Sequence, residues 1–97
     1  MYRLEYLQIA HCDILEAELY LYEHNPIAAD KFMAEVEKQE AYLVDKPYMY
    51  PVYEAKPYFR IMPLTYKYLC FYHVDEDTKI ITVHRILRGM RDIHNTL

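Results

Sequence analysis

The chain has 97 residues, of which 54% are hydrophobic and 27% are charged, and its formal net charge is −4. This length predicts one domain, 1–97, and the balance of apolar and charged residues excludes an intrinsically disordered chain. Its single glycine, Gly89, excludes a glycine-rich phosphate-binding loop. There is no signal-peptide pattern and no uncharged stretch long enough to span a bilayer, so we expect a cytoplasmic protein without a membrane partner.

The first half of the chain predicts one strand followed by two helices. Apolar residues alternate over 2–7, which indicates a half-buried strand. From about residue 9 they recur every three or four positions, as in an amphipathic helix. The stripe expected to face the core consists of Cys12, Leu15, Leu19 and Tyr22. The pair Asn25-Pro26 ends this helix and starts a second, which runs to about Val44. Its predicted core stripe is Ala29, Phe32, Val36 and Leu43.

The second half predicts three strands. Residues 45–57 contain three prolines and are expected to form an extended connector. Strands are predicted over 58–62, 66–74 and 79–87, with a turn at 75–78 and a short polar tail after Gly89. The expected fold is therefore α+β, in the order β-α-α-β-β-β. An antiparallel helical hairpin should pack on one face of a largely antiparallel four-stranded sheet.

The cysteines, the histidines and the apolar residues outside the core stripes lead to separate predictions. Cys12 and Cys70 are expected to be reduced core residues, and the five histidines lack the spacing of a metal site. Five apolar residues fall outside the predicted stripes and are expected to form an exposed patch for a partner: Ile14, Leu21, Met33, Leu69 and Phe71. The alternative is that Ile14 and Leu21 complete the core.

The charge is unevenly distributed along the chain. Residues 1–55 have a balance of −7 (four Lys or Arg against eleven Asp or Glu), and residues 56–97 have +3 (seven against four). The later basic side chains are expected to converge on one side of the sheet, where they could bind phosphate and stabilise a phosphoryl group in transfer. The candidate catalytic residues are Arg60, Lys67, Arg85, Arg88 and Arg91, with His94 as a proton-transfer group.

The chain resembles RelE/ParE toxins over almost its whole length. The resemblance is carried by the N-terminal Tyr2-Arg3-Leu4-Glu5-Tyr6, by Asn25-Pro26-Ile27-Ala28-Ala29-Asp30-Lys31-Phe32, by Phe71-Tyr72-His73-Val74-Asp75-Glu76, and by Val83-His84-Arg85-Ile86-Leu87-Arg88-Gly89. It implies a toxin of a type II toxin–antitoxin system, of the plasmid-stabilisation branch. Its implied partner is a cognate antitoxin, and the assembly is either a homodimer or a toxin–antitoxin hetero-oligomer.

Within that family the resemblance implies three alternatives. RelE-like members are endoribonucleases that cut mRNA on the ribosome without metal or cofactor, and ParE-like members poison DNA gyrase. The third alternative is a toxin that retains only antitoxin binding. Arg60, Arg85, Arg88, Arg91 and His94 match basic or late catalytic positions of the nucleases, and this favours an mRNA interferase. However, Leu69 stands where many nucleases have arginine, with Lys67 two residues away, and the chain is acidic where the toxins are usually basic.

Overall fold

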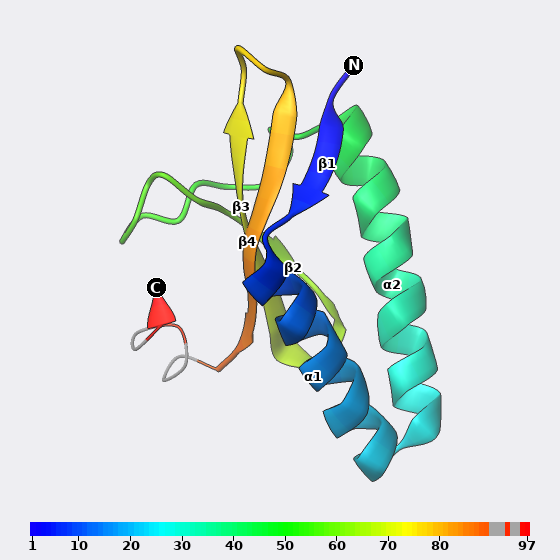
Figure 1. The fold of residues 1–97 in the computed structure, drawn as a ribbon. Helices are drawn as coiled ribbons and strands as arrows, with labels where there is room; N and C mark the ends of the chain where they lie inside the picture. Colours follow the sequence, from blue (N-terminus) through cyan, green and yellow to red (C-terminus); the bar gives the residue numbers. More distant parts are fainter. Residues whose placement is uncertain (90–92, 94–95) are drawn as a thin grey trace.

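The computed structural model describes residues 1–89, 93, 96 and 97 and shows an α+β fold. Strand β1 (Arg3–Tyr6) leads into helices α1 (Gln8–His24) and α2 (Pro26–Asp45). Strands β2 (Arg60–Pro63), β3 (Tyr68–Asp75) and β4 (Ile80–Arg88) follow, with a short 3-10 turn at Thr65–Lys67. The sheet order is β1-β4-β3-β2, with β1 parallel to β4 and the other pairs antiparallel (Figure 1). The predicted element order and fold class are confirmed.

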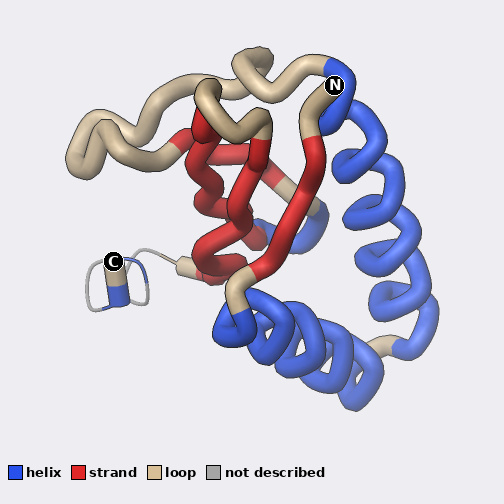
Figure 2. Tube along the Cα trace, turned by 45° about the horizontal axis from the view of Figure 1, so that its top comes forward, coloured by secondary structure: helices blue, strands red, loops and turns tan. Residues whose placement is uncertain are grey.

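The two helices form a hairpin on one side of the sheet (Figure 2). Asn25 joins them with a backbone N–H that donates to the Leu21 carbonyl at 2.6 Å, and its side-chain Oδ1 accepts from the Ile27 N–H at 3.1 Å. Pro26 occupies the first turn of α2, where its missing N–H has no intrahelical partner. The predicted helix boundary at Asn25-Pro26 is therefore confirmed.

The core stripe predicted for α2 is confirmed, whereas the one predicted for α1 is wrong. Ala29, Phe32, Val36 and Leu43 are all buried. In α1 the buried apolar residues are instead Ala10, Ile14, Ala17 and Leu21, while Leu15, Leu19 and Tyr22 are 64%, 59% and 60% exposed. Alanines at two positions of the buried face let α1 lie close to β4 and α2, with Ile14 and Leu21 filling the space beside them.

The predicted apolar patch for a partner is also wrong in its residues. Ile14 and Leu21 complete the core, as in the alternative interpretation, and Met33 packs partly buried against it. Phe71 is fully buried in a second cluster with Leu87 and Ile93. Leu69 is partly buried against the same cluster. Cys12 is exposed rather than in the core, and only Cys70 of the two cysteines is buried.

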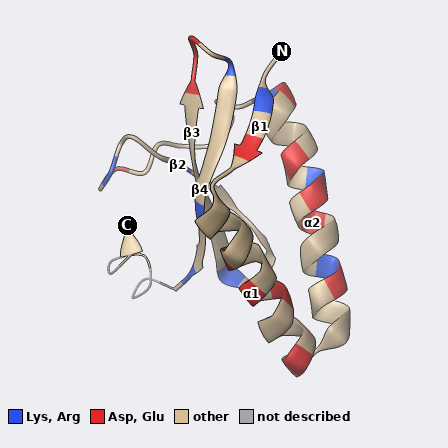
Figure 3. Ribbon diagram, in the orientation of Figure 1, with Lys and Arg blue, Asp and Glu red and all other residues tan. Residues whose placement is uncertain are grey.

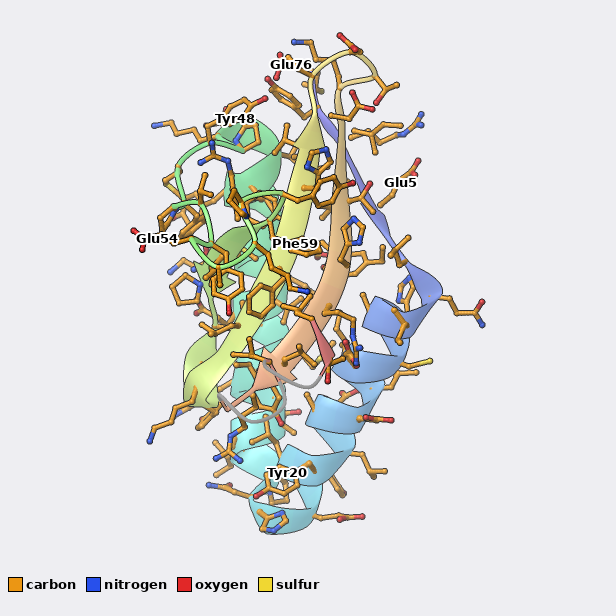
Figure 4. The ribbon with its side chains drawn as sticks, turned by 90° about the vertical axis from the view of Figure 1, so that its left-hand side faces the viewer. Glu5, Tyr20, Tyr48, Glu54, Phe59 and Glu76 are labelled. Carbon is orange, nitrogen blue, oxygen red and sulfur yellow. The ribbon has the colours of Figure 1, made fainter. Side chains whose placement is uncertain are left out.

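The connector between α2 and β2 covers the face of the sheet that the helices leave open. Tyr53 and Phe59 pack on the second cluster, and Phe59 lies in front of the sheet in Figure 4. The buried Tyr72 hydroxyl donates to the Pro47 carbonyl at 2.7 Å and so ties the start of the connector to β3. Both faces of the sheet are therefore covered by apolar packing.

The turn between β3 and β4 forms where the sequence predicts it, but it has contacts that the sequence did not predict. Asp75 Oδ1 accepts from the backbone N–H groups of Asp77 and Thr78 at 3.0 and 3.4 Å. The Glu76 carboxylate accepts from the hydroxyls of Tyr2 and Tyr48 and pairs with the Lys79 ammonium. Glu76 thus joins the N-terminus, the connector and the hairpin.

Candidate functional site

A buried ion pair links α1 to the C-terminal part of β4. Asp13 is 7% exposed and accepts from Arg85 Nε and Nη2 at 2.7 and 2.9 Å. Asp13 Oδ2 also accepts from the Ile86 backbone N–H at 3.0 Å. Since β1 pairs with β4 only as far as Val83, the carboxylate takes the place of a neighbouring strand at Ile86. The hydrogen bond from Arg85 to Asp13 raises the pKa of the guanidinium.

An open cavity of about 550 Å³ lies beside this pair, between α1 and the end of β4. The Arg88 guanidinium carbon lies 5.5 Å from the centre of the Tyr20 ring and 5.9 Å from that of Tyr68. Arg88 Nε donates to the Tyr66 carbonyl at 3.1 Å. The cavity is therefore lined by two arginines, by tyrosine rings and by the Asp13 and Glu16 carboxylates, and it suits a polar, aromatic or charged group.

The turn between β2 and β3 adjoins this cavity and has an unfavourable backbone conformation. Tyr66 and Lys67 have φ of 57° and 66°, in the left-handed region that Asn and Gly usually occupy. The Leu64 N–H donates to the Tyr68 carbonyl at 2.9 Å and closes the turn. Contrary to expectation, Lys67 is not on the β3 strand and does not share a face with Leu69. Its side chain is exposed. It lies near the Arg88 end of the sheet, because the next residue, Tyr68, is the cross-strand partner of Arg88.

Arg60 lies at a different place. Its Nη1 donates to the Tyr50 carbonyl at 2.7 Å, and its guanidinium carbon lies 4.9 Å from the centre of the Tyr48 ring. In the sheet Arg60 pairs with Tyr72 near the middle of β3, whereas Arg88 pairs with Tyr68 at its start. The Arg60 side chain lines a second hollow with Tyr48 and Tyr58, and not the cavity that Arg85 and Arg88 line. The labelled Tyr48 and Tyr20 lie well apart in Figure 4. The structure therefore does not bring Arg60 together with Arg85 and Arg88. Arg91 and His94 lie outside the described residues.

Aromatic and histidine side chains form a group on the connector side of β3 and β4. The sequence did not predict this group. The Tyr58 ring stacks on His73, with centroids 3.9 Å apart, and meets His84 edge-on at 5.6 Å. His73 and His84 are not cross-strand partners, as expected, but a register shift after Phe71 leaves them close. Burial and the neighbouring His73 lower the pKa of His84. Among the residues described, no group of three or more His, Cys, Asp or Glu side chains is placed to hold a metal ion.

The charge on the molecule follows the division seen in the sequence. Acidic side chains occupy both helices, whereas the basic side chains of the second half lie mostly on the sheet and its turns (Figure 3). No helix in the described part of the chain is long and apolar enough to cross a bilayer. These features define a small α+β protein with a tyrosine-lined cavity at one end of its sheet, and two arginines and two carboxylates line that cavity.

Comparison with known proteins identifies the family. Residues 4–93 match the model of the ParE toxin of the type II toxin–antitoxin system parDE, and the chain belongs to this family. The fold is similar to a solved chain described as the chromosomal ParDE TA system from P. aeruginosa. That similarity has a TM-score of 0.74 and 20% sequence identity, covering 91% of this chain and 96% of the other. No curated protein matches the chain in sequence. The resemblance to RelE/ParE toxins is thereby confirmed.

Proposed function

We propose that this protein is a cytoplasmic toxin, silenced by a cognate antitoxin, that inhibits its target by binding rather than by cutting RNA. The ParE family match and the resemblance to ParE toxins favour DNA gyrase as the target. The observation that carries the proposal is the dispersal of the basic side chains. Arg60 contacts the Tyr48 ring and lines a different hollow from Arg88, and Arg85 is paired with a buried carboxylate. Phosphoryl transfer without metal needs several such groups around one phosphate.

The test is growth arrest with separate readouts for the two targets. The chain is induced without an antitoxin, and purified chain is added to a gyrase supercoiling assay. The proposal expects arrest, inhibition of supercoiling with trapped gyrase–DNA breaks, and intact messages. Messages cut within ribosomes, with gyrase unaffected, would overturn it in favour of the nuclease. Absence of arrest from well-folded chain would identify a protein that retains only antitoxin binding.

A ribosome-dependent endonuclease remains the second candidate, because Arg88 lines a cavity with Tyr20 and Tyr68, and Lys67 is on the turn directly before Tyr68. In that case Arg88, Lys67 and Arg85 would contact the scissile phosphate, and Arg91 and His94 would keep the roles that the resemblance gives them. Arg60 would take no part, because it lines a different hollow. Arg88→Ala and Lys67→Ala should then abolish RNA cleavage in the purified ribosome assay. Tyr42→Ala, which alters an exposed residue of α2 outside the cavity lining, is the matched control.

A further inference from the structure

The outer face of α1 carries an apolar stripe that nothing in the described structure covers. Cys12, Leu15, Leu19 and Tyr22 follow one another at steps of three, four and three residues. The face that packs on the core consists of Ala10, Asp13, Ile14, Ala17 and Leu21. At 100° per residue, the two sets lie on opposite sides of the helix. This helix therefore has a second apolar face, and that face is turned to solvent.

The spacing of this stripe indicates what kind of element would cover it. Alternating steps of three and four are those of the a and d positions in a two-helix coiled coil. A single sheet edge or an extended peptide would require a period of two. The stripe runs over roughly three helical turns, about 15 Å at 1.5 Å per residue. The complementary element is therefore a helix of at least three turns with its own apolar seam.

The charges beside the stripe select among helices. If Cys12 and Leu19 occupy a positions, Glu16 and Glu23 occupy e positions on one flank of the stripe. Glu18 occupies the g position on the other flank. These positions form the ion pairs that determine partner choice in coiled coils. None of the three glutamates is in an ion pair within residues 1–89, although Arg85 senses the charge of Glu16. Helix α1 contains no Lys or Arg (Figure 3).

A second copy of this chain does not fit these flanks. In a parallel α1 pair Glu18 would face Glu23 of the other copy, and in an antiparallel pair Glu18 would face Glu18. Like charges at these positions destabilise the pairing. A helix with Lys or Arg at its e and g positions would instead form ion pairs on both sides.

We propose that the outer face of α1 is a docking surface for a partner helix that has an apolar a/d seam flanked by basic residues. This inference is independent of the proposed target, since it depends only on the surface of α1. Leu15 and Leu19 supply the apolar anchors, and Glu18 and Glu23 select the charge of the partner, whereas Glu16 also lines the cavity beside Arg85.

The test uses two synthetic three-heptad peptides with leucine at a and d. One has lysine at its e and g positions, and the control has glutamate there. We expect the purified full-length chain to bind the lysine peptide at least tenfold more tightly by fluorescence anisotropy, with affinity falling as salt rises. Binding should also slow alkylation of the exposed Cys12 thiol. Equal binding of both peptides would overturn the proposal.

Variants of the chain test the surface itself. Leu15→Ala with Leu19→Ala should weaken binding of the lysine peptide at least tenfold, while Tyr42→Ala on α2 should leave it unchanged. Glu18→Lys with Glu23→Lys should reverse the preference between the peptides. These residues are not in the core, and unfolding curves will show that the variants stay folded. Unchanged affinity in both variants, or a homodimer in sedimentation that Leu19→Ala dissociates, would refute the proposed partner. Toxicity and gyrase inhibition do not enter these measurements, so either proposal can fail without the other.

Discussion

Among the described residues, Asp13 is the only charged residue that is buried. It satisfies the Ile86 N–H that no strand reaches and neutralises Arg85, whose side chain is only 18% exposed. Removing one partner of such a pair leaves a buried charge without compensation, which costs more than the intact pair contributes. Arg85 therefore serves α1–β4 packing, and its loss cannot be interpreted as a loss of catalysis alone.

We accordingly predict that Arg85→Ala lowers the free energy of unfolding by about 2 kcal/mol, because the Asp13 carboxylate loses two hydrogen bonds. Urea unfolding at neutral pH measures this change. Arg88→Ala, which alters an exposed arginine of the same strand, should remain within about 0.5 kcal/mol of the parent chain. Equal stability of the two variants would show that the Asp13–Arg85 pair contributes little.

At the other end of the sheet, the contacts of Glu76 predict that the stability of the fold falls in acid. The hydrogen bond from Lys79, followed by those from Tyr48 and Tyr2, lowers the pKa of Glu76 to about 2 from 4.5. A carboxyl whose pKa is depressed by folding stabilises the fold above its unfolded pKa and loses that effect as pH falls through the folded pKa. The melting temperature should therefore fall between about pH 5 and pH 2, and this fall should be smaller in Glu76→Gln. The exposed Glu54→Gln is the control and should keep the slope of the parent chain.

At the scale of elements, the β2–β3 turn is under local strain. Lys67 adopts a left-handed conformation that its Cβ disfavours, directly after another left-handed residue. Such strain is often kept where a side chain must be presented, and here the turn exposes Lys67 beside the cavity of Arg85 and Arg88.

We predict that Lys67→Gly raises the free energy of unfolding by about 0.5–1 kcal/mol, since glycine adopts positive φ without steric cost. Lys67→Ala retains the Cβ and should leave stability unchanged, although it removes the same charge. Denaturant unfolding of the two variants separates backbone strain from charge. If both variants shift equally, the effect comes from the charge and not from the backbone.

At the scale of the whole molecule, the reactivity of Cys12 reports on the native surface, and that of Cys70 reports on global unfolding. Cys12 is on the outer face of α1, while Cys70 is 1% exposed in the core and burial raises the pKa of its thiol. We predict that one thiol per chain reacts with Ellman's reagent within seconds in native buffer, and the second only at the rate of global unfolding. Cys12→Ser should remove the fast phase and Cys70→Ala the slow one. A fast reaction of both thiols would contradict this packing.

Local periodicity and the residues at helix and turn boundaries were enough to predict several elements of the fold. The alternation at 2–7, the Asn25-Pro26 boundary, the stripe of α2 and the turn at 75–78 each have a local physical cause, and together they define the α+β element order. The succession of motifs was also sufficient to recognise the toxin family.

Which face of α1 is buried and where each arginine lies depend instead on how the elements pack against one another. Helix α1 has apolar residues on two faces, and both sets recur with a helical period, so periodicity did not separate the face of Leu15 and Leu19 from that of Ile14 and Leu21. Close packing on β4 instead selected the alanine face, because small side chains allow the helix to approach the sheet. The pairing of Arg85 with Asp13 spans 72 positions. The separation of Arg60 from Arg88 likewise depends on how the connector and the β2–β3 turn are placed. Spacing along the chain predicts which strand a residue is on, but it does not predict which neighbouring residue its side chain contacts.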